Sequence, residues 1–383
     1  MMVKCGIDRL GEYSNLFRGK RLGMVTSVSG VTADGRPSYL VFHEQFPLSC
    51  IFSPEHGLHA NFGNGENVTE TAVEPQTGAA LVSLFGNWTA KSIPEHWISR
   101  LDAVVYDIQD LGTRFYTFIT TMIRVLEDCA GAGKEMIILD RPAVLGGRIV
   151  EGGMLESRYQ SFIGPYNLPI RYGLTVGELA WMVNAERNLN CKLHVVPCAG
   201  WERSQMFPAY GDRWVSPSGA ISNFDTALLY PGMCLFEGTN LSEGRGTGRA
   251  FQLVGAPFID GQRLRREMDA LQLPGIAFEA AQFCPASSKF KGETCSGVSL
   301  RITDAEAFRT VRTGVSLLYK ILELHPGLVE FPPSHWSAEP HIRFLSGCDT
   351  LDGPRPPLDQ LLENWERDCT AFRERKIKYQ IYT

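Results

Sequence analysis

The stretch Ala103-Val-Val-Tyr-Asp-Ile-Gln-Asp110 decides the fold that this sequence predicts. A short apolar run of this kind is typical of a strand that is buried on both faces of a parallel sheet. Three further runs share this form, each followed at once by polar side chains: residues 22–25 before Thr26-Ser27, residues 50–53 before Pro54-Glu55, and residues 136–139 before Asp140-Arg141. Because ligands of an open parallel α/β sheet bind outside the carboxyl ends of its strands, the sequence predicts one shared site at these four ends.

The segments between these runs have the period of amphipathic helices. Apolar residues at spacings of three and four predict one helix that ends near Gly131; they are Phe115, Phe118, Met122, Val125 and Cys129. A second helix is predicted to begin after Thr175, because Thr175-Val-Gly-Glu178 is a capping box. This alternation over residues 20–197 predicts an α/β fold with a sheet covered by helices.

Residues 198–383 are predicted to form a second, smaller α/β domain. Residues 297–302 indicate a strand, and Thr303-Asp-Ala-Glu306 is the predicted start of a helix whose apolar face continues to residue 322. A further apolar stripe over residues 358–372 predicts another helix. We therefore expect a catalytic domain over residues 1–197 and a domain over residues 198–383 that closes a cleft.

The composition argues against several classes of function. A net charge of −5 and a pI near 6.0 do not fit a nucleic-acid partner. No apolar run is long enough for a membrane span. The first residues lack the pattern of a signal peptide, so we expect a cytoplasmic protein, or an exported one whose signal has been removed. The phosphate-binding glycine motifs are absent, so the sequence predicts no nucleotide cofactor. A metal is not the first prediction either, because His56 and His59 outside a helix do not place two imidazoles on one face.

Carboxylates are the remaining candidates for chemistry. Two facing carboxyl groups suffice to cleave a glycosidic bond, one giving a proton to the leaving oxygen and one acting as nucleophile or base. Glu55 is the first candidate, with His56 and His59 placed to orient it or to bind a sugar hydroxyl. Two alternatives remain open: Glu55 as a mere cap of the following turn, and all three side chains as ligands of a metal ion.

The residues after the apolar run at Ala103 are the second candidate group. Asp110 is followed by Gly112, which lets the backbone approach a ligand, and then by Arg114 and Tyr116. Asp110 is also a candidate N-cap of the helix that follows. Asp140 and Arg141 occupy the equivalent place after another strand, and we expect both to bind substrate.

A loop rich in glycine and arginine is the third candidate group. It contains Asn240, Glu243 and Arg245, and such a loop brings backbone amides and guanidinium groups close to an anion unless it is only a flexible turn. Because arginine suits bidentate carboxylate recognition, an acidic group on the substrate is predicted by four arginines together, namely Arg141, Arg171, Arg245 and Arg249.

Several long motifs resemble those of the exo-β-N-acetylmuramidase (NamZ-type, DUF1343) family. They are FSPEHGL at 52–58, VVYDIQDLGTRFYTFI at 104–119, ILDRP at 138–142, LGG and VEGG at 145–153, RYGLTVGELA at 171–180, LLYPGMCLFEGTNLSEGRGT at 228–247 and GAPFI at 255–259. The resemblance implies a Rossmann-like parallel-sheet domain with a smaller α/β domain. It also implies that the chain releases terminal N-acetylmuramic acid from the non-reducing end of peptidoglycan fragments.

The resemblance also implies roles for particular residues. The glutamate of the EHG motif, here Glu55, is implied as the catalytic acid. The resemblance does not settle the ionised partner, for which we expect Asp110, or else Glu243. The lactyl carboxylate of the sugar requires an arginine, for which Arg114, Arg141 and Arg245 are the candidates. The substrate is then a peptidoglycan disaccharide or a muropeptide fragment.

This sequence differs from the family pattern at two positions. Ser27 and Ala143 stand where the family usually has asparagine. The loss of two amide side chains motivates one alternative, a non-catalytic protein that binds or senses cell-wall sugars.

Overall fold

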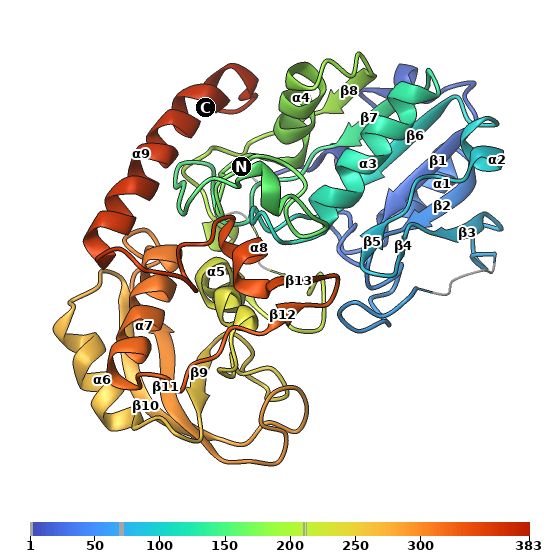
Figure 1. The fold of residues 1–383 in the computed structure, drawn as a ribbon. Helices are drawn as coiled ribbons and strands as arrows, with labels where there is room; N and C mark the ends of the chain where they lie inside the picture. The colour runs from blue at the N-terminus through green and yellow to red at the C-terminus, as the bar shows by residue number, and fades with distance from the viewer. Residues whose placement is uncertain (1–2, 69–72, 210, 212) are drawn as a thin grey trace. The chain divides into compact units, whose positions relative to one another are not determined.

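The computed structural model describes residues 3–68, 73–209, 211 and 213–383 (Figure 1). The chain forms two compact units that are interleaved in sequence. The first comprises Met1–Ile149, Gly173–Gly219 and Glu374–Thr383, and the second comprises Val150–Tyr172 and Ala220–Arg373. The predicted boundary between residues 197 and 198, which separates a catalytic domain from a domain that closes the cleft, stays a prediction.

A six-stranded sheet forms the centre of the first unit. Its strands lie in the order β3-β2-β1-β6-β7-β8, and every neighbouring pair is parallel. The bounds are β1 Leu22–Thr26, β2 Leu48–Ser53, β3 Ala80–Ser83, β6 Ala103–Asp107, β7 Glu135–Leu139 and β8 Lys192–Val196. Counted within this sheet, the strand order is 3-2-1-4-5-6, which is the Rossmann order. The predicted fold class is therefore confirmed.

Helices and short elements complete the first unit. The helices are α1 Ser38–Gln45, α2 Glu95–Ile98, α3 Phe118–Gly131 and α4 Val176–Glu186, and a small hairpin joins β4 Phe85–Gly86 to β5 Thr89–Ala90. Figure 1 shows α3 and α4 lying over β6, β7 and β8, with which they make contact. The predicted apolar face of α3 is buried, and the capping box of Thr175 and Glu178 at the start of α4 is confirmed. Strand residues such as Met24, Val105 and Ile137 are fully buried, as expected of a parallel sheet covered by helices.

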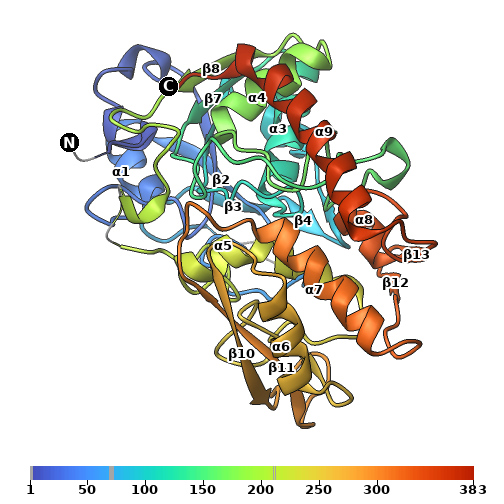
Figure 2. The same cartoon turned by 90° about the vertical axis from the view of Figure 1, so that its left-hand side faces the viewer.

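The second unit contains an antiparallel sheet with the strand order β10-β11-β9. Its strands are β9 Leu253–Ala256, β10 Ile276–Phe283 and β11 Cys295–Ile302, and a two-stranded ribbon pairs β12 Pro333–Ser334 with β13 Ser337–Pro340. The helices are α5 Phe224–Met233, α6 Gly261–Ala270, α7 Thr310–Leu324, α8 His341–Ser346 and α9 Leu358–Lys376. Figure 2 shows α6 beside α7 and against β10 and β11, in agreement with their contacts.

The predicted start of a helix at Thr303 is wrong. Asp304 Oδ1 instead accepts hydrogen bonds from the backbone N–H groups of Glu306 and Ala307 at 2.9 and 3.1 Å. These bonds close a turn, which is the alternative use of an Asp side chain next to a helix. The helix α7 therefore begins only at Thr310.

Among the residues that the structure describes, none of the helices combines the length and the apolar composition that a membrane span requires.

Candidate active site

The carboxyl ends of β2, β1, β6 and β7 lie at one edge of the sheet, as predicted. The strand order reverses between β1 and β6, and such a switch point is where open α/β sheets bind ligands. Thr26 and Asp107 pair in register there, and the Thr26 hydroxyl donates to the Asp107 carbonyl oxygen at 2.8 Å. The side chains that follow these strands are therefore close neighbours.

Glu55 follows β2 and is almost completely buried, with 2% of its surface exposed. Its Oε1 accepts a hydrogen bond from the Gly65 backbone N–H at 2.9 Å, and its Oε2 accepts one from the Thr117 hydroxyl at 2.5 Å. These donors belong to two different connections of the sheet. The Glu55 carboxyl group is thus held at both oxygens, and it does not simply cap the turn that follows it.

His56 has an unusual backbone conformation directly after Glu55. Its φ is 71°, and Gly57 follows with a φ of 78°. A non-glycine residue in this left-handed region costs about 1–3 kcal/mol and is often found at functional sites. His56 Nδ1 lies 3.0 Å from the Phe62 carbonyl oxygen, whereas His59 is exposed. Within the described ranges no group of three His, Cys, Asp or Glu side chains could hold a metal ion, so the ligand set of Glu55, His56 and His59 gains no support.

Asp110 lies in the connection between β6 and α3 and is buried. Its Oδ2 accepts the Gly112 backbone N–H at 2.6 Å, and Gly112 has the positive φ of 73° that favours glycine. The prediction that Asp110 is the N-cap of the following helix is wrong, because Thr117 occupies that position. Arg114 and Tyr116 lie buried in the same connection.

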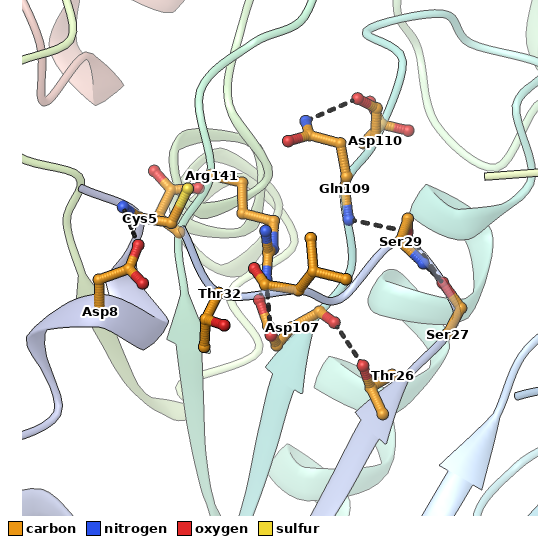
Figure 3. A network of polar contacts seen from close by, with 12 residues as sticks. Cys5, Asp8, Thr26, Ser27, Ser29, Thr32, Asp107, Gln109, Asp110 and Arg141 are labelled. Carbon is orange, nitrogen blue, oxygen red and sulfur yellow. Dashed lines mark hydrogen bonds and ion pairs between the residues drawn. The ribbon is translucent and has the colours of Figure 1, made fainter. Parts of the chain in front are cut away.

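A chain of hydrogen bonds links the ends of β1, β6 and β7 (Figure 3). The hydroxyl oxygens of Ser27 and Ser29 are 2.9 Å apart, and Ser29 Oγ accepts the Gln109 backbone N–H at 3.3 Å. The Gln109 side-chain amide donates to the carbonyl oxygens of Pro142 and Asp110 at 2.9 and 3.0 Å. The loops that follow β1, β6 and β7 are therefore tied to one another.

Arg141 forms a buried bidentate ion pair with Asp107, the last residue of β6 (Figure 3). Arg141 Nε lies 2.6 Å from Asp107 Oδ1, and Nη2 lies 2.9 Å from Oδ2 and 2.8 Å from the Val31 carbonyl oxygen. Burial disfavours the charge of the guanidinium, but the adjacent Asp107 outweighs burial and raises the pKa of Arg141. We infer that Arg141 links the ends of β6 and β7 through Asp107, and that another cationic group binds the substrate carboxylate.

Asp140 is fully buried and anchors the start of α4. One of its oxygens accepts the hydroxyl groups of Thr175 at 2.7 Å and Tyr382 at 2.6 Å, and the other accepts the Gly177 backbone N–H at 2.9 Å. Burial raises the pKa of the Asp140 carboxyl group to about 6, against the lowering effect of these hydrogen bonds. We infer a structural role for Asp140 in place of the predicted contact with substrate.

The raised pKa of Asp140 predicts how the stability of the chain depends on pH. The pKa rises from 3.8 to about 6 on folding, so between these values the folded state holds a proton that the unfolded state has lost. The contribution of Asp140 to the free energy of unfolding is therefore fully present below pH 3.8, and it falls by about 3 kcal/mol as the pH rises through 6. Asp140→Asn retains an acceptor for Gly177 and is expected to remove this fall. Thermal unfolding midpoints from pH 4 to 7 test this, and parallel curves for the two proteins would contradict it.

The predicted residues of the Gly-Arg loop lie in the second unit. Glu243 is buried, and its carboxylate lies 3.0 Å from Lys289 Nζ and 3.8 Å from Arg245 Nε. Arg245 is bound more closely by Glu237, at 2.6 Å. Burial lowers the pKa of Arg245, but Glu237 and Glu243 outweigh it and raise that pKa. The second unit thus contains a compact network of acidic and basic side chains.

Lys289 holds this network in place, and sequence reasoning did not identify it. Its ammonium group donates to the carbonyl oxygens of Phe236 and Leu241 at 2.7 and 2.9 Å and to Glu243 at 3.0 Å. Asn240 is used similarly: its amide donates to the Leu328 carbonyl oxygen at 2.9 Å, and its Oδ1 accepts the Glu330 N–H at 3.0 Å. We infer that both side chains shape the loop.

The two departures from the family pattern occupy different surroundings. Ala143 is buried in an apolar cluster with Val3, Cys198 and Trp201. Ser27 lies in the hydrogen-bonded chain at the end of β1. The alanine therefore fits its apolar neighbours, and only Ser27 belongs to the polar edge of the sheet.

Sequence reasoning also missed Thr117 and Gly65, the two donors to Glu55. Thr117 stands immediately before an apolar helical run, a pattern that predicts an N-cap. Nothing in that pattern indicates a bond to a carboxylate 62 positions earlier in the chain.

The fold and the edge just described define a class: a Rossmann-like α/β protein with acidic side chains at the switch point of its sheet. Comparison with known proteins then gives the family. The family described as exo-beta-N-acetylmuramidase NamZ, N-terminal, matches residues 22–225, and its C-terminal counterpart matches residues 228–382. The chain belongs to this family, which confirms the predicted resemblance and the assignment as a glycosidase.

Individual relatives agree with this membership. The chain is 39% identical to the peptidoglycan beta-N-acetylmuramidase NamZ of Bacillus subtilis (strain 168), over 99% of this chain and 91% of that protein. Two crystal structures of DUF1343 family proteins from Bacteroides fragilis NCTC 9343 are also similar. One has a TM-score of 0.90 at 29% identity and the other 0.79 at 27% identity, and each match covers 100% of this chain and 99% of the other.

Proposed function

We propose that this glycosidase hydrolyses the β-1,4 bond of a terminal N-acetylmuramic acid at the non-reducing end of peptidoglycan fragments, with Glu55 as the proton donor. The observation that carries the proposal is the burial of Glu55 at the end of β2, with both oxygens held by donors from different connections. A general acid must be fixed relative to the oxygen that it protonates. The family membership supplies the class of bond.

The proposed reaction consumes one water molecule. As the bond between C1 of muramic acid and the bridging oxygen breaks, its electron pair goes to the oxygen, which takes a proton from Glu55. Water then supplies the hydroxyl group on C1, and its proton restores the acid. Asp110, in the connection after β6, is the proposed ionised partner. Glu243 stays the alternative prediction.

The substrate carries a lactyl carboxylate that needs a cationic partner. Arg141 and Arg245 each bind a protein carboxylate closely, at 2.6 Å. We propose Arg114 for this role because it lies between Asp110 and Thr117, in the connection that carries the other proposed residues. The proposed natural substrate is a muropeptide-derived disaccharide. The cytoplasmic location stays a prediction.

A comparison of sugar substrates tests this function. The purified chain is expected to release phenol from an aryl N-acetyl-β-muramide and muramic acid from the disaccharide. An aryl N-acetyl-β-glucosaminide, which lacks only the lactyl group, should react far more slowly. Equal rates on the two aryl glycosides would refute recognition of the lactyl group, and binding of the disaccharide without any cleavage would refute the enzyme.

A further inference from the structure

The two oxygens of Glu55 have partners of different chemical kinds. The Gly65 backbone N–H can only donate, so Oε1 must accept in every protonation state. The Thr117 hydroxyl can donate or accept. When Glu55 carries a proton, that proton therefore belongs on Oε2, where the hydroxyl can accept it.

The donor to Oε1 is itself fixed in place. Gly65 has a φ of 72°, a conformation that other residues rarely adopt. A Cβ atom at this position would lie 2.2 Å from the Trp88 ring. The loop thus requires glycine at residue 65, and its N–H stays directed at Oε1.

Thr117 departs from the usual role of its position. It is the N-cap of α3, where a Thr hydroxyl ordinarily accepts a backbone N–H of the first helical turn. Here its side chain makes no capping hydrogen bond and is directed to Glu55 instead. Helix α3 thus lacks the stabilising hydrogen bond of a side-chain cap, because the Thr117 hydroxyl binds the Glu55 carboxyl group instead.

We propose that Thr117 is a positioning residue for the proton transfer, which places the reactive proton on Glu55 Oε2 and donates to that oxygen once the proton has left. This inference rests on the proposed function. In the step, the proton moves from Oε2 to the bridging oxygen while the bond from C1 to that oxygen breaks. As the proton leaves, the Thr117 hydroxyl rotates, and its hydrogen bonds to the negative charge that develops on Oε2.

This role predicts an effect on turnover rather than on binding. A hydrogen bond to a buried charge that forms during the step stabilises the transition state more than the bound substrate. Thr117→Val removes the hydroxyl at nearly constant shape and is expected to lower kcat on the disaccharide by about 10- to 100-fold, with KM unchanged. Thr117→Ser restores a hydroxyl and should recover most of kcat.

The experiment measures kcat and KM for Thr117→Val, Thr117→Ser and a matched control, Thr113→Val. Thr113 lies in the same connection, and its buried hydroxyl has no hydrogen-bond partner among the described residues. The loss should be smaller on an aryl muramide with an acidic phenol, because such a leaving group needs little protonation. A structural role alone would affect both substrates equally.

The outcomes separate this inference from the proposed function. Wild-type activity of Thr117→Val, or an equal loss in Thr113→Val, would overturn the role of Thr117 and leave Glu55 as the acid. An inactive wild-type chain would overturn both proposals. If Thr117→Val does not fold, as judged by its circular dichroism, Thr117→Ala takes its place with the same expected ratio between the two substrates.

Discussion

Glu55→Gln is expected to lower kcat on the disaccharide by about 100- to 10,000-fold, the usual contribution of a positioned general acid. Glutamine has the shape of glutamate but no proton to give. Its oxygen can still accept the Gly65 N–H, and its amide can donate to the Thr117 hydroxyl. The fold should therefore persist while turnover is lost.

The control for Glu55→Gln is Glu66→Gln in the same loop. Glu66 is exposed, and its carboxylate accepts the Gly63 N–H at 2.8 Å, a bond that glutamine can keep. This variant should retain wild-type turnover. The measurement is release of muramic acid from the disaccharide and of phenol from an aryl muramide. The defect of Glu55→Gln should be larger on the disaccharide, and a kcat above a tenth of the wild-type value there would refute the assignment.

Asp107→Ala is expected to lower the free energy of unfolding by about 3–5 kcal/mol. The variant leaves the buried guanidinium of Arg141 without its carboxylate partner, which now lies 2.6 Å away. Because the ion pair joins the end of β6 to the loop that follows β7, its loss should loosen the edge that carries the candidate site. The midpoint of urea unfolding measures the effect.

A double variant separates the ion pair from the packing around it. Asp107→Leu combined with Arg141→Met removes both charges and fills much of their volume with apolar groups. Replacing a whole buried ion pair in this way is often neutral or stabilising, so the double variant should be markedly more stable than Asp107→Ala. If the two variants unfold at the same urea concentration, the uncompensated charge is not the cause of the loss.

The sheet was predictable because its strands are short, apolar and buried on both faces. The apolar runs around Met24, Val105 and Ile137 are too short to show helical periodicity, and each ends at polar residues. The carboxyl ends of four strands then had to share one edge. The start of α7 was mispredicted because Asp304 can close a turn as readily as it caps a helix.

The partners within the site were far less predictable. The sequence shows that Glu55, Asp107 and Arg141 follow strands, but not that Arg141 pairs with Asp107 across 34 positions. Such pairings depend on the directions in which the side chains point once the sheet has formed, and the spacing of residues along the sequence does not show these directions. From sequence alone, an arginine at a strand end is therefore an equally good candidate for binding substrate and for pairing with a neighbouring acidic side chain.

The place of residues 374–383 in the first unit bears on how the protein matures during synthesis. Tyr382 reaches Asp140 within that unit, and the Ile381 backbone N–H donates to Glu178 at 2.8 Å. A ribosome makes these residues after the whole of the second unit, although chains generally fold from the N-terminus as they emerge. The first unit, which holds Glu55, can therefore be completed only after nearly the entire polypeptide has been translated.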